Sequence, residues 1–163
     1  MPLKRLFASG CVAALAAAAY SAPHASAAGR CWDPKDREIA FLRKMNRARG
    51  SLGRLRLDPQ LSQVARTHTR AMTRRNELFH SSPSQLARRV TRWKLLGENV
   101  GLGSTVTSLH RAFMSSSGHR ANILRDQFRH VGIGVKRRNG RLWVTVIFES
   151  YSDPGTTLRM PSC

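Results

Sequence analysis

Apolar residues alternate along the C-terminal part of this chain, from Val131 to Phe148, and this pattern constrains the fold more than any other feature. Asn139-Gly140 interrupts the pattern, and this pair favours a tight type I′ turn between two antiparallel strands. In the second half, residues 142–148, both faces of the predicted strand are largely apolar. A strand with two apolar faces is typically covered from both sides, so we expect it at the centre of a sheet.

Two helices are predicted ahead of this hairpin, each by an aspartate-proline pair followed by an apolar stripe. Aspartate caps a helix N-terminus, and proline at the first helical position loses no needed hydrogen bond. The first helix is expected to open at Asp33-Pro34 and to stop near Gly50. The second is expected to open at Asp58-Pro59 and to run to about Asn76.

Two more helical patterns lie between the second helix and the hairpin. A short basic helix is expected around residues 85–90, and an amphipathic helix from Thr105 is broken by the serines and glycine of residues 115–118. Gly101 and Gly103 are expected to bracket a turn, and strand signals appear only after the last helix. Helices first and a hairpin last predict an antiparallel sheet packed against helices.

The first 28 residues are expected to be a signal peptide. A positive start at Lys4 and Arg5 precedes an alanine-rich apolar run, and small residues around Ala27-Ala28-Gly29 fit a cleavage site. Lipoprotein anchoring through Cys11 is not expected, because the main apolar run follows that cysteine. No later segment approaches the ~20 apolar residues of a membrane helix, so the mature chain is predicted to be secreted without a transmembrane segment.

Residues 29–163 are enough for one domain with a real core and too few for two. We expect a single domain, because no internal repeat and no linker is visible. Two cysteines remain after cleavage, Cys31 and Cys163, and in an oxidising compartment they are expected to form a disulfide that joins the two ends of the domain.

The chain is strongly basic, with a formal net charge of +19. Arginines are scattered through the predicted helices and loops instead of forming one tail. Such a field favours anionic partners, here cell-wall polymers or acidic lipid surfaces. A secreted protein does not meet chromosomal DNA, so nucleic acid is not expected as a partner. A composition bias towards arginine codons explains the charge equally well.

Three side chains stand out as a candidate site: His80, Glu98 and His119. Each lies beside a glycine or a serine near the end of a predicted helix, a position that places polar side chains at the rim of a cleft. If one carboxylate and two imidazoles converge, they can hold a divalent cation, share a proton or bind a polar ligand. Each histidine can also have a structural role, as a hydrogen-bonded group that fixes loops between helices.

The order and spacing of several short motifs resemble the CAP superfamily, also called the SCP-like extracellular domain, in its short bacterial form. The resemblance covers residues 36–151. The matching motifs are Met45-Asn46-Arg47-Ala48-Arg49, Asp58-Pro59-Gln60-Leu61, Phe79-His80-Ser81, Gly97-Glu98-Asn99, and Gly118-His119-Arg120-Ala121-Asn122-Ile123-Leu124.

The resemblance implies an α+β fold, a three-layer α-β-α sandwich with a mainly antiparallel central sheet and a central cleft. In many members two histidines and two glutamates line the cleft and can bind a divalent cation such as zinc. His80, Glu98 and His119 match three of those positions, with the two histidines as the metal ligands. The fourth glutamate is expected in the helix before His119, where this chain has Phe113-Met114-Ser115-Ser116.

Three hypotheses about function follow. The first is a secreted binding module whose cleft receives a small ligand, a lipid or a cation, with a basic exterior near anionic envelope material. The second is a metal-assisted hydrolase or protease with Glu98 as general base. The third is an adhesion or interaction protein with a non-functional cleft. The missing carboxylate favours binding over catalysis, and no cofactor is required by the sequence.

The remaining histidines and the serines beside the site are interpreted as structural. His68 lies on the apolar stripe of the second helix and is expected in the core, whereas His110 and His130 are expected at the surface or its boundary. Ser81 and Ser117 neighbour the two site histidines, but neither lies in the Gly-x-Ser-x-Gly turn that exposes a hydrolase nucleophile.

Overall fold

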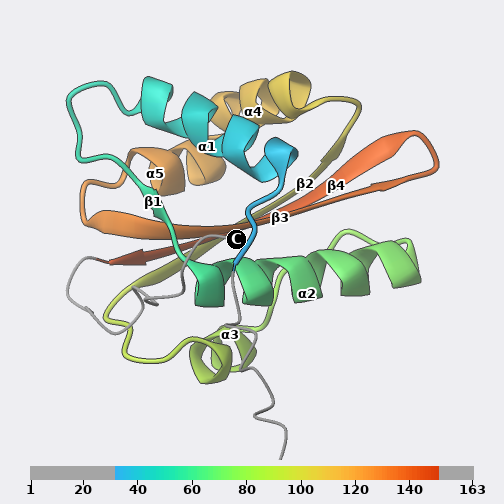
Figure 1. The fold of residues 1–163 in the computed structure, drawn as a ribbon, viewed down its shortest axis with the longest axis horizontal. Helices are drawn as coiled ribbons and strands as arrows, with labels where there is room; N and C mark the ends of the chain where they lie inside the picture. The colour runs from blue at the N-terminus through green and yellow to red at the C-terminus, as the bar shows by residue number, and fades with distance from the viewer. Residues whose placement is uncertain (1–31, 151–163) are drawn as a thin grey trace, which may run out of the picture.

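Two layers of helices enclose a four-stranded sheet in the computed structural model, which describes residues 32–150 (Figure 1). The strand order is β1-β3-β4-β2. The strands are β1 (Arg56–Leu57), β2 (Leu96–Gly103), β3 (Phe128–Arg138) and β4 (Arg141–Ser150). Cys11, Cys31, Cys163 and the predicted signal peptide lie outside the described residues. Among the described residues, no helix has the length and apolar character needed to cross a membrane.

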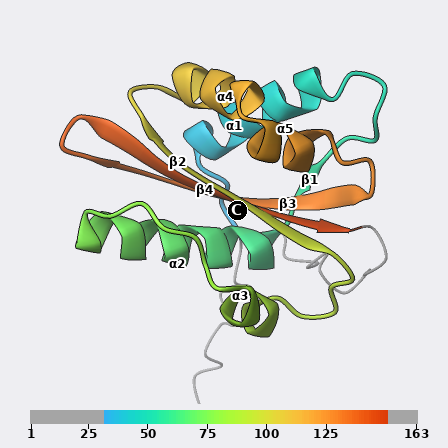
Figure 2. The ribbon, with the colours of Figure 1, turned by 180° about the vertical axis from the view of Figure 1, so that it is seen from behind.

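Helices cover both faces of the sheet, as Figures 1 and 2 show from opposite sides. One layer holds α1 (Asp36–Ala48), α4 (Val106–Ser115) and α5 (Ser117–Leu124), and the other holds α2 (Pro59–Arg75) and α3 (Pro83–Arg89). The predicted α+β three-layer sandwich is therefore confirmed. The sheet is mixed: β1 pairs with β3 in parallel, while β3–β4 and β4–β2 are antiparallel.

Strand β4 occupies the centre of the sheet, as its two apolar faces predicted. Every residue from Leu142 to Ser150 is buried. Val144, Val146 and Phe148 pack with α1, α4 and α5, whereas Ile147 packs with Leu61, Val64 and Leu86 of α2 and α3. Each such side chain contributes about 1.5–3 kcal/mol when it is fully buried. The turn before β4 is also as predicted, with φ of 48° at Asn139 and 72° at Gly140.

The segment from Leu96 to Gly103 forms strand β2, so the expectation of a turn at Gly101 and Gly103 is wrong. Its glycines lie where helices pack closely on the sheet. A Cβ on Gly101 would lie 2.7 Å from the ring of Phe113, and one on Gly97 would lie 2.9 Å from the ring of Phe128. Sequence reasoning took these glycines as loop residues, whereas close approach of aromatic rings explains them.

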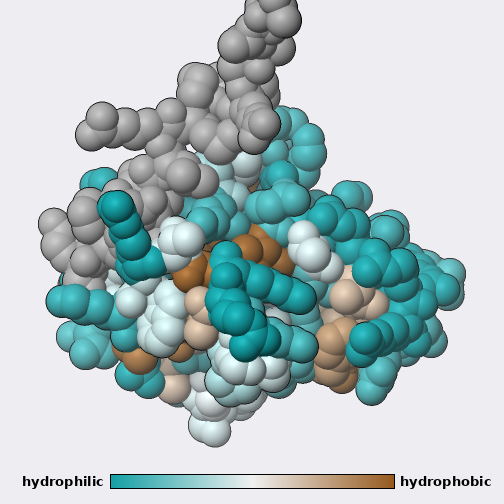
Figure 3. All heavy atoms as spheres, turned by 90° about the horizontal axis from the view of Figure 1, so that it is seen from below, coloured by the Kyte–Doolittle hydropathy of each residue, from teal (hydrophilic) through white to brown (hydrophobic). Residues whose placement is uncertain are grey.

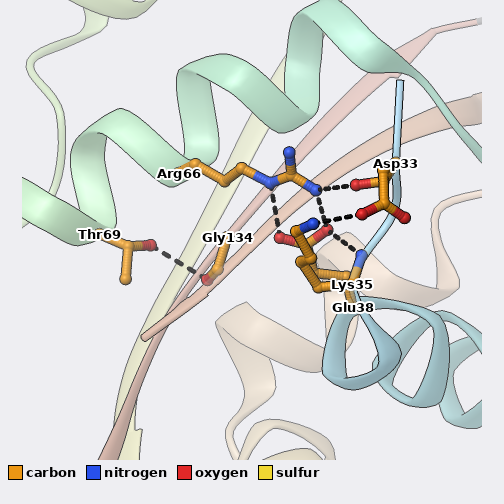
Figure 4. A network of polar contacts seen from close by, with 6 residues as sticks. All are labelled: Asp33, Lys35, Glu38, Arg66, Thr69 and Gly134. Atoms are coloured by element: carbon orange, nitrogen blue, oxygen red, sulfur yellow. Dashed lines mark hydrogen bonds and ion pairs between the residues drawn. The ribbon is translucent and has the colours of Figure 1, made fainter. Parts of the chain in front are cut away.

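The start of α1 also differs from the prediction. The helix begins at Asp36, and Asp33 does not cap it. Instead, Glu38 accepts a hydrogen bond from the backbone N–H of Lys35 at 3.0 Å, and its carboxylate pairs with the guanidinium of Arg66 on α2 (Figure 4). Arg66 also donates to the backbone oxygen of Asp33 at 2.9 Å. This network joins the segment before α1 to the opposite helix layer across the edge of the sheet.

The second helix is built as predicted. Asp58 caps α2 by accepting from the backbone N–H of Leu61 at 2.9 Å, and Asn76 ends it with a left-handed backbone conformation. The short basic helix begins slightly earlier than expected, at Pro83, with Ser82 as its cap. Helix α5 was not predicted, because the serines and glycine of residues 115–118 were interpreted as a break and not as the start of a new helix.

Candidate functional site

Glu98 lies near the start of β2 and contacts the loop between α2 and α3. Its Oε1 atom accepts two hydrogen bonds, from His80 Nδ1 at 2.9 Å and from the backbone N–H of Ser81 at 2.8 Å. The two partners are neighbours in the Phe79-His80-Ser81 motif, so one carboxylate oxygen fixes this loop against the sheet. The structure thus brings His80 and Glu98 together, and Glu98 orients the histidine ring.

The second carboxylate oxygen of Glu98, Oε2, has no such partners in the described part of the chain. The side chain is only 6% exposed, and Oε2 is buried without a hydrogen-bond partner among the described residues. Burial of an unpaired carboxylate oxygen is costly, and native proteins rarely leave one without a reason. His80, by contrast, is 56% exposed. The pair therefore presents an accessible imidazole above a buried acceptor atom.

His119 lies in the first part of α5 and follows Glu98 in the sequence, whereas His80 precedes it. Its ring packs against Phe113, with 4.7 Å between the ring centroids. Burial lowers the pKa of His119, and the nearby charge of His80 lowers it further. The two histidines are thus close enough to repel each other when protonated. No hydrogen bond or ion pair joins the side chains of His119 and Glu98 among the described residues.

Two asparagines attach α5 to β2, and the sequence analysis gave neither a role. Asn99 Nδ2 donates to the backbone oxygen of His119 at 3.0 Å, and Asn122 Nδ2 donates to Asn99 Oδ1 at 2.9 Å and to the backbone oxygen of Glu98 at 3.3 Å. Their place inside the Glu98 and His119 motifs was the available signal. These bonds set the position of His119 relative to Glu98.

An apolar pocket of about 540 Å³ opens beside His80 and Glu98. Its wall is formed by α3 and by the chain that leads into β2, with Leu86, Ala87, Trp93, Leu95 and Leu96. We call this space the α3 pocket. Trp93 is 41% exposed although it is a large aromatic residue, and its indole N–H donates to the backbone oxygen of Ala87 at 3.1 Å. Figure 3 shows hydrophobic areas among hydrophilic side chains on this side of the molecule.

The side chain of Ser81 bonds to His68 and not to its sequence neighbour His80. Its hydroxyl donates to His68 Nδ1 at 3.1 Å, because His68 Nε2 is the donor to the backbone oxygen of Phe79 at 2.8 Å. His68 is buried, as predicted for the core. This pair resembles a serine with its base, yet the backbone N–H of Ser81 is already bound to the Glu98 carboxylate. That negative charge would repel the oxyanion that forms in acyl transfer.

Two further histidines were expected at the surface or its boundary. His130 is instead buried on β3, and its Nδ1 lies 2.9 Å from Glu149 Oε2 on β4. The pairing of adjacent strands creates this contact, and the sequence spacing gives no sign of it. His110 is half-buried on α4, and burial lowers its pKa, with a smaller effect from Lys44.

A divalent cation is implied by the family resemblance, but the described residues do not fit one. Residues 32–150 contain no group of three or more histidine, cysteine, aspartate or glutamate side chains arranged to hold a metal ion. Glu98 Oε1 is already occupied by two donors. The helix position expected to carry a second glutamate holds Met114, Ser115 and Ser116. A three-ligand metal site is therefore not provided by this part of the chain.

The fold, the cleft and the motifs that build them agree with one family. Residues 42–148 match the family described as CAP, the cysteine-rich secretory protein family. The chain belongs to this family. It is 30% identical over 115 residues to the uncharacterized protein YkwD of Bacillus subtilis strain 168, an alignment that covers 66% of this chain and 44% of the relative.

Solved structures agree with this assignment. An extracellular protein containing an SCP domain from Bacillus anthracis is 29% identical, with a TM-score of 0.60 over 69% of this chain and 39% of that one. An outer surface protein of Borrelia burgdorferi has a TM-score of 0.66 at 18% identity, over 75% of this chain and 98% of that one. The chain thus spans less than half the length of its two Bacillus relatives, and the names of the two solved structures describe extracellular or surface proteins.

Proposed function

We propose that this CAP protein is a secreted binding module whose cleft at His80 and Glu98 takes a small amphipathic ligand. The proposal rests on the Oε2 atom of Glu98, a residue that lines the α3 pocket. This atom is buried and has no hydrogen-bond partner among the described residues. A ligand whose polar head donates a hydrogen bond or carries a positive charge would satisfy this oxygen. This bond would stabilise the complex strongly, because the carboxylate oxygen is buried away from water and is unpaired without the ligand.

The α3 pocket supports an apolar body for the same ligand. Its walls are mainly leucine, alanine and tryptophan side chains, and its volume of about 540 Å³ lies within the range of small-molecule sites. Exposed Trp93 and half-buried Leu95 lose contact with water when the ligand's chain enters. An aliphatic chain of a lipid or a related small molecule therefore fits the pocket better than a sugar or a nucleotide does.

Binding suits this geometry better than hydrolysis. The only serine that contacts a histidine base in the described site has its N–H occupied by Glu98. A metal-assisted route needs ligands that do not converge in the described residues. The site offers a fixed carboxylate and an exposed imidazole, which recognise a head group.

The location and surface partners of the protein belong to the same proposal. We infer export through the predicted signal peptide, cleaved near Ala27-Ala28-Gly29, and association of the basic exterior with anionic cell-wall polymers or acidic lipids. The extracellular and surface relatives and the formal net charge of +19 support this inference. Retention on such material should fall steeply with salt, because exposed charges are screened over about 8 Å at physiological ionic strength.

Head-group chemistry gives the sharpest test of the cleft. Dodecylamine and dodecanoate have the same chain and opposite charge, so binding of each, followed by calorimetry, separates the two parts of the proposal. We expect the amine to bind more tightly, and Glu98→Gln to remove this preference while the chain still binds. Glu77→Gln, an exposed carboxylate outside the pocket, is the control for a change in net charge. Equal binding of amine and acid by the wild type would reject Glu98 as the head-group acceptor.

Trp93 provides a second readout of the same event. Its fluorescence should change as a chain fills the α3 pocket, and Trp93→Phe should remove that change but keep most of the heat of binding. A signal that survives in Trp93→Phe would place the ligand elsewhere.

Zinc binding is the prediction made from the family resemblance, and calorimetric titration of the wild type and His80→Ala/His119→Ala tests it. Equal heats in both proteins would reject a cation bound by these histidines.

A further inference from the structure

A second pocket, separate from the cleft, is lined by arginines. It has a volume of about 730 Å³ and lies beside α1, β1 and the start of β3. Arg54, Arg56 and Arg129 line it, together with Asn46 and His130, and no aspartate or glutamate is among its described lining residues. We call it the arginine pocket. It shares no described lining residue with the α3 pocket.

The arginines of this pocket keep most of their donors unused. The guanidinium groups of Arg54 and Arg56 donate no hydrogen bond to another described residue, and that of Arg129 donates one, to the backbone oxygen of Phe128 at 3.1 Å. Each guanidinium carries five N–H donors in a planar fork that matches the oxygens of phosphate or carboxylate. Three such groups around one cavity, with no carboxylate to neutralise them in the described lining, favour an anion with several oxygens.

The backbone beneath the arginines is held in place by buried polar side chains. Asn46 clamps the segment between Arg54 and Arg56, because its side chain binds both the N–H and the oxygen of Leu55, at 2.8 and 3.0 Å. Arg49 donates to the oxygens of Gly53 and Phe128, the residues that precede Arg54 and Arg129. The two chain segments that carry the arginines are thus joined through Arg49 and cannot move apart freely.

Gly53 makes room for one of the three guanidinium groups. A Cβ at this position would lie 3.0–3.3 Å from the guanidinium atoms of Arg129. Arg129 therefore lies over the glycine, and a side chain there would require its guanidinium to shift by a few tenths of an ångström. The field in this region is positive, since the charge of Arg129 adds to burial in lowering the pKa of Arg49, while Asp126 acts in the opposite direction.

We propose that the arginine pocket binds a phosphate group carried by a larger molecule outside the cell. Three guanidinium groups on a fixed backbone match the charge and the oxygen geometry of a phosphate better than those of a single carboxylate. The volume of about 730 Å³ and the apolar side chains of Leu42 and Leu55 leave space for the group that carries the phosphate. Two sources share this chemistry, a soluble or polymeric phosphate and a phospholipid head group.

The test compares two triple variants with the same net charge. Arg54→Gln/Arg56→Gln/Arg129→Gln removes the pocket, and Arg74→Gln/Arg111→Gln/Arg138→Gln removes three exposed arginines elsewhere. Calorimetry with sodium tripolyphosphate at low salt should show saturable binding that is at least about tenfold weaker in the first variant and nearly unchanged in the second. Equal weakening in both, or no saturable binding by the wild type, would overturn the proposal.

Sedimentation with phosphatidylglycerol vesicles distinguishes the source of the phosphate. If the pocket variant loses both tripolyphosphate binding and vesicle binding, the site is open to lipid head groups. If it loses tripolyphosphate binding alone, a soluble or polymeric phosphate is supported. The pocket variant should keep the preference of the cleft for dodecylamine over dodecanoate, which separates this proposal from that of the cleft.

Discussion

Two buried charged side chains, Arg49 and Glu98, are satisfied to very different degrees. Arg49 donates to four backbone oxygens, those of Gly53, Ile123, Arg125 and Phe128, at 2.6–3.1 Å. Glu98 has two donors on one carboxylate oxygen and none on the other among the described residues. Arg49, in which every nitrogen has an acceptor, joins α1 to α5 and β3, whereas Glu98, with one unpartnered oxygen among the described residues, lines a pocket. Satisfaction of hydrogen bonds thus separates a structural charge from a candidate binding group.

Removal of Arg49 should have the largest effect on stability. Arg49→Ala leaves four carbonyl oxygens without their donor in a buried place, and we expect a loss of about 3–5 kcal/mol in the free energy of unfolding. Urea denaturation measures this loss. Arg47→Ala, an exposed arginine in the last turn of the same helix, should change stability by less than about 0.5 kcal/mol. Similar losses in the two variants would contradict the structural role of Arg49.

Glu38 gives an intermediate case, because its buried charge is neutralised by a partner. Arg66 binds both carboxylate oxygens of Glu38, and the ion pair raises the pKa of Arg66. Glu38→Gln removes the charge and leaves the guanidinium partly buried, so we expect a loss of about 2–3 kcal/mol. Asp36→Asn, exposed on the first turn of α1, is the matched control for thermal and urea denaturation. A loss no greater than that of the control would show that the pair adds little.

Glu98→Gln should change stability little and binding strongly. The amide oxygen can still accept from Ser81 and His80, and the buried unpaired charge disappears, so we expect stability within about 1 kcal/mol of the wild type. The same variant should lose its preference for an amine head group. Urea denaturation and the amine titration must be read together. A loss of stability as large as that of Arg49→Ala would make Glu98 a structural residue and remove the contrast.

The smallest expected effect is a change in the titration of His119. Its lowered pKa means that the folded protein favours the neutral ring, so the contribution to stability is complete above the ordinary pKa of 6.5 and declines as the pH falls towards the folded value. His80→Gln removes the repelling charge and should raise the pKa of His119 towards its ordinary value. Proton NMR of the His119 imidazole in the presence of a chelator measures its titration in the wild type and in His80→Gln. An unchanged midpoint would show that the two rings do not share one site.

The sequence predicted the central strand, because apolar residues on both of its faces have only one favourable environment. It also predicted the Asn139-Gly140 turn and the Asp58 cap, which depend on a few neighbouring residues. It failed at β2 and α5. There the glycines and serines have weak local preferences, and in β2 the rings of Phe113 and Phe128 fill the space that side chains on Gly101 and Gly97 would need.

The candidate site was predicted in part for the same reason. Motif order indicated His80, Glu98 and His119, but no local pattern showed that Ser81 would contact His68 or that Asn99 and Asn122 would fix α5. The arginine pocket was hidden in a general excess of basic residues. Arg54 and Arg129 are far apart in sequence, and the close approach of Arg129 to Gly53 and the bonds of Arg49 bring them to one cavity.

By itself the sequence determined the fold class and the family, and it indicated His80, Glu98 and His119 as site candidates, since these follow from local periodicity and from the order of short motifs. Only the tertiary structure decided which charges are satisfied. Hydrogen bonds between distant segments and the exclusion of water set that property, so Arg49 joins several elements through four hydrogen bonds while Glu98 keeps one buried oxygen without a partner among the described residues. Sequence spacing carries no information about either contact.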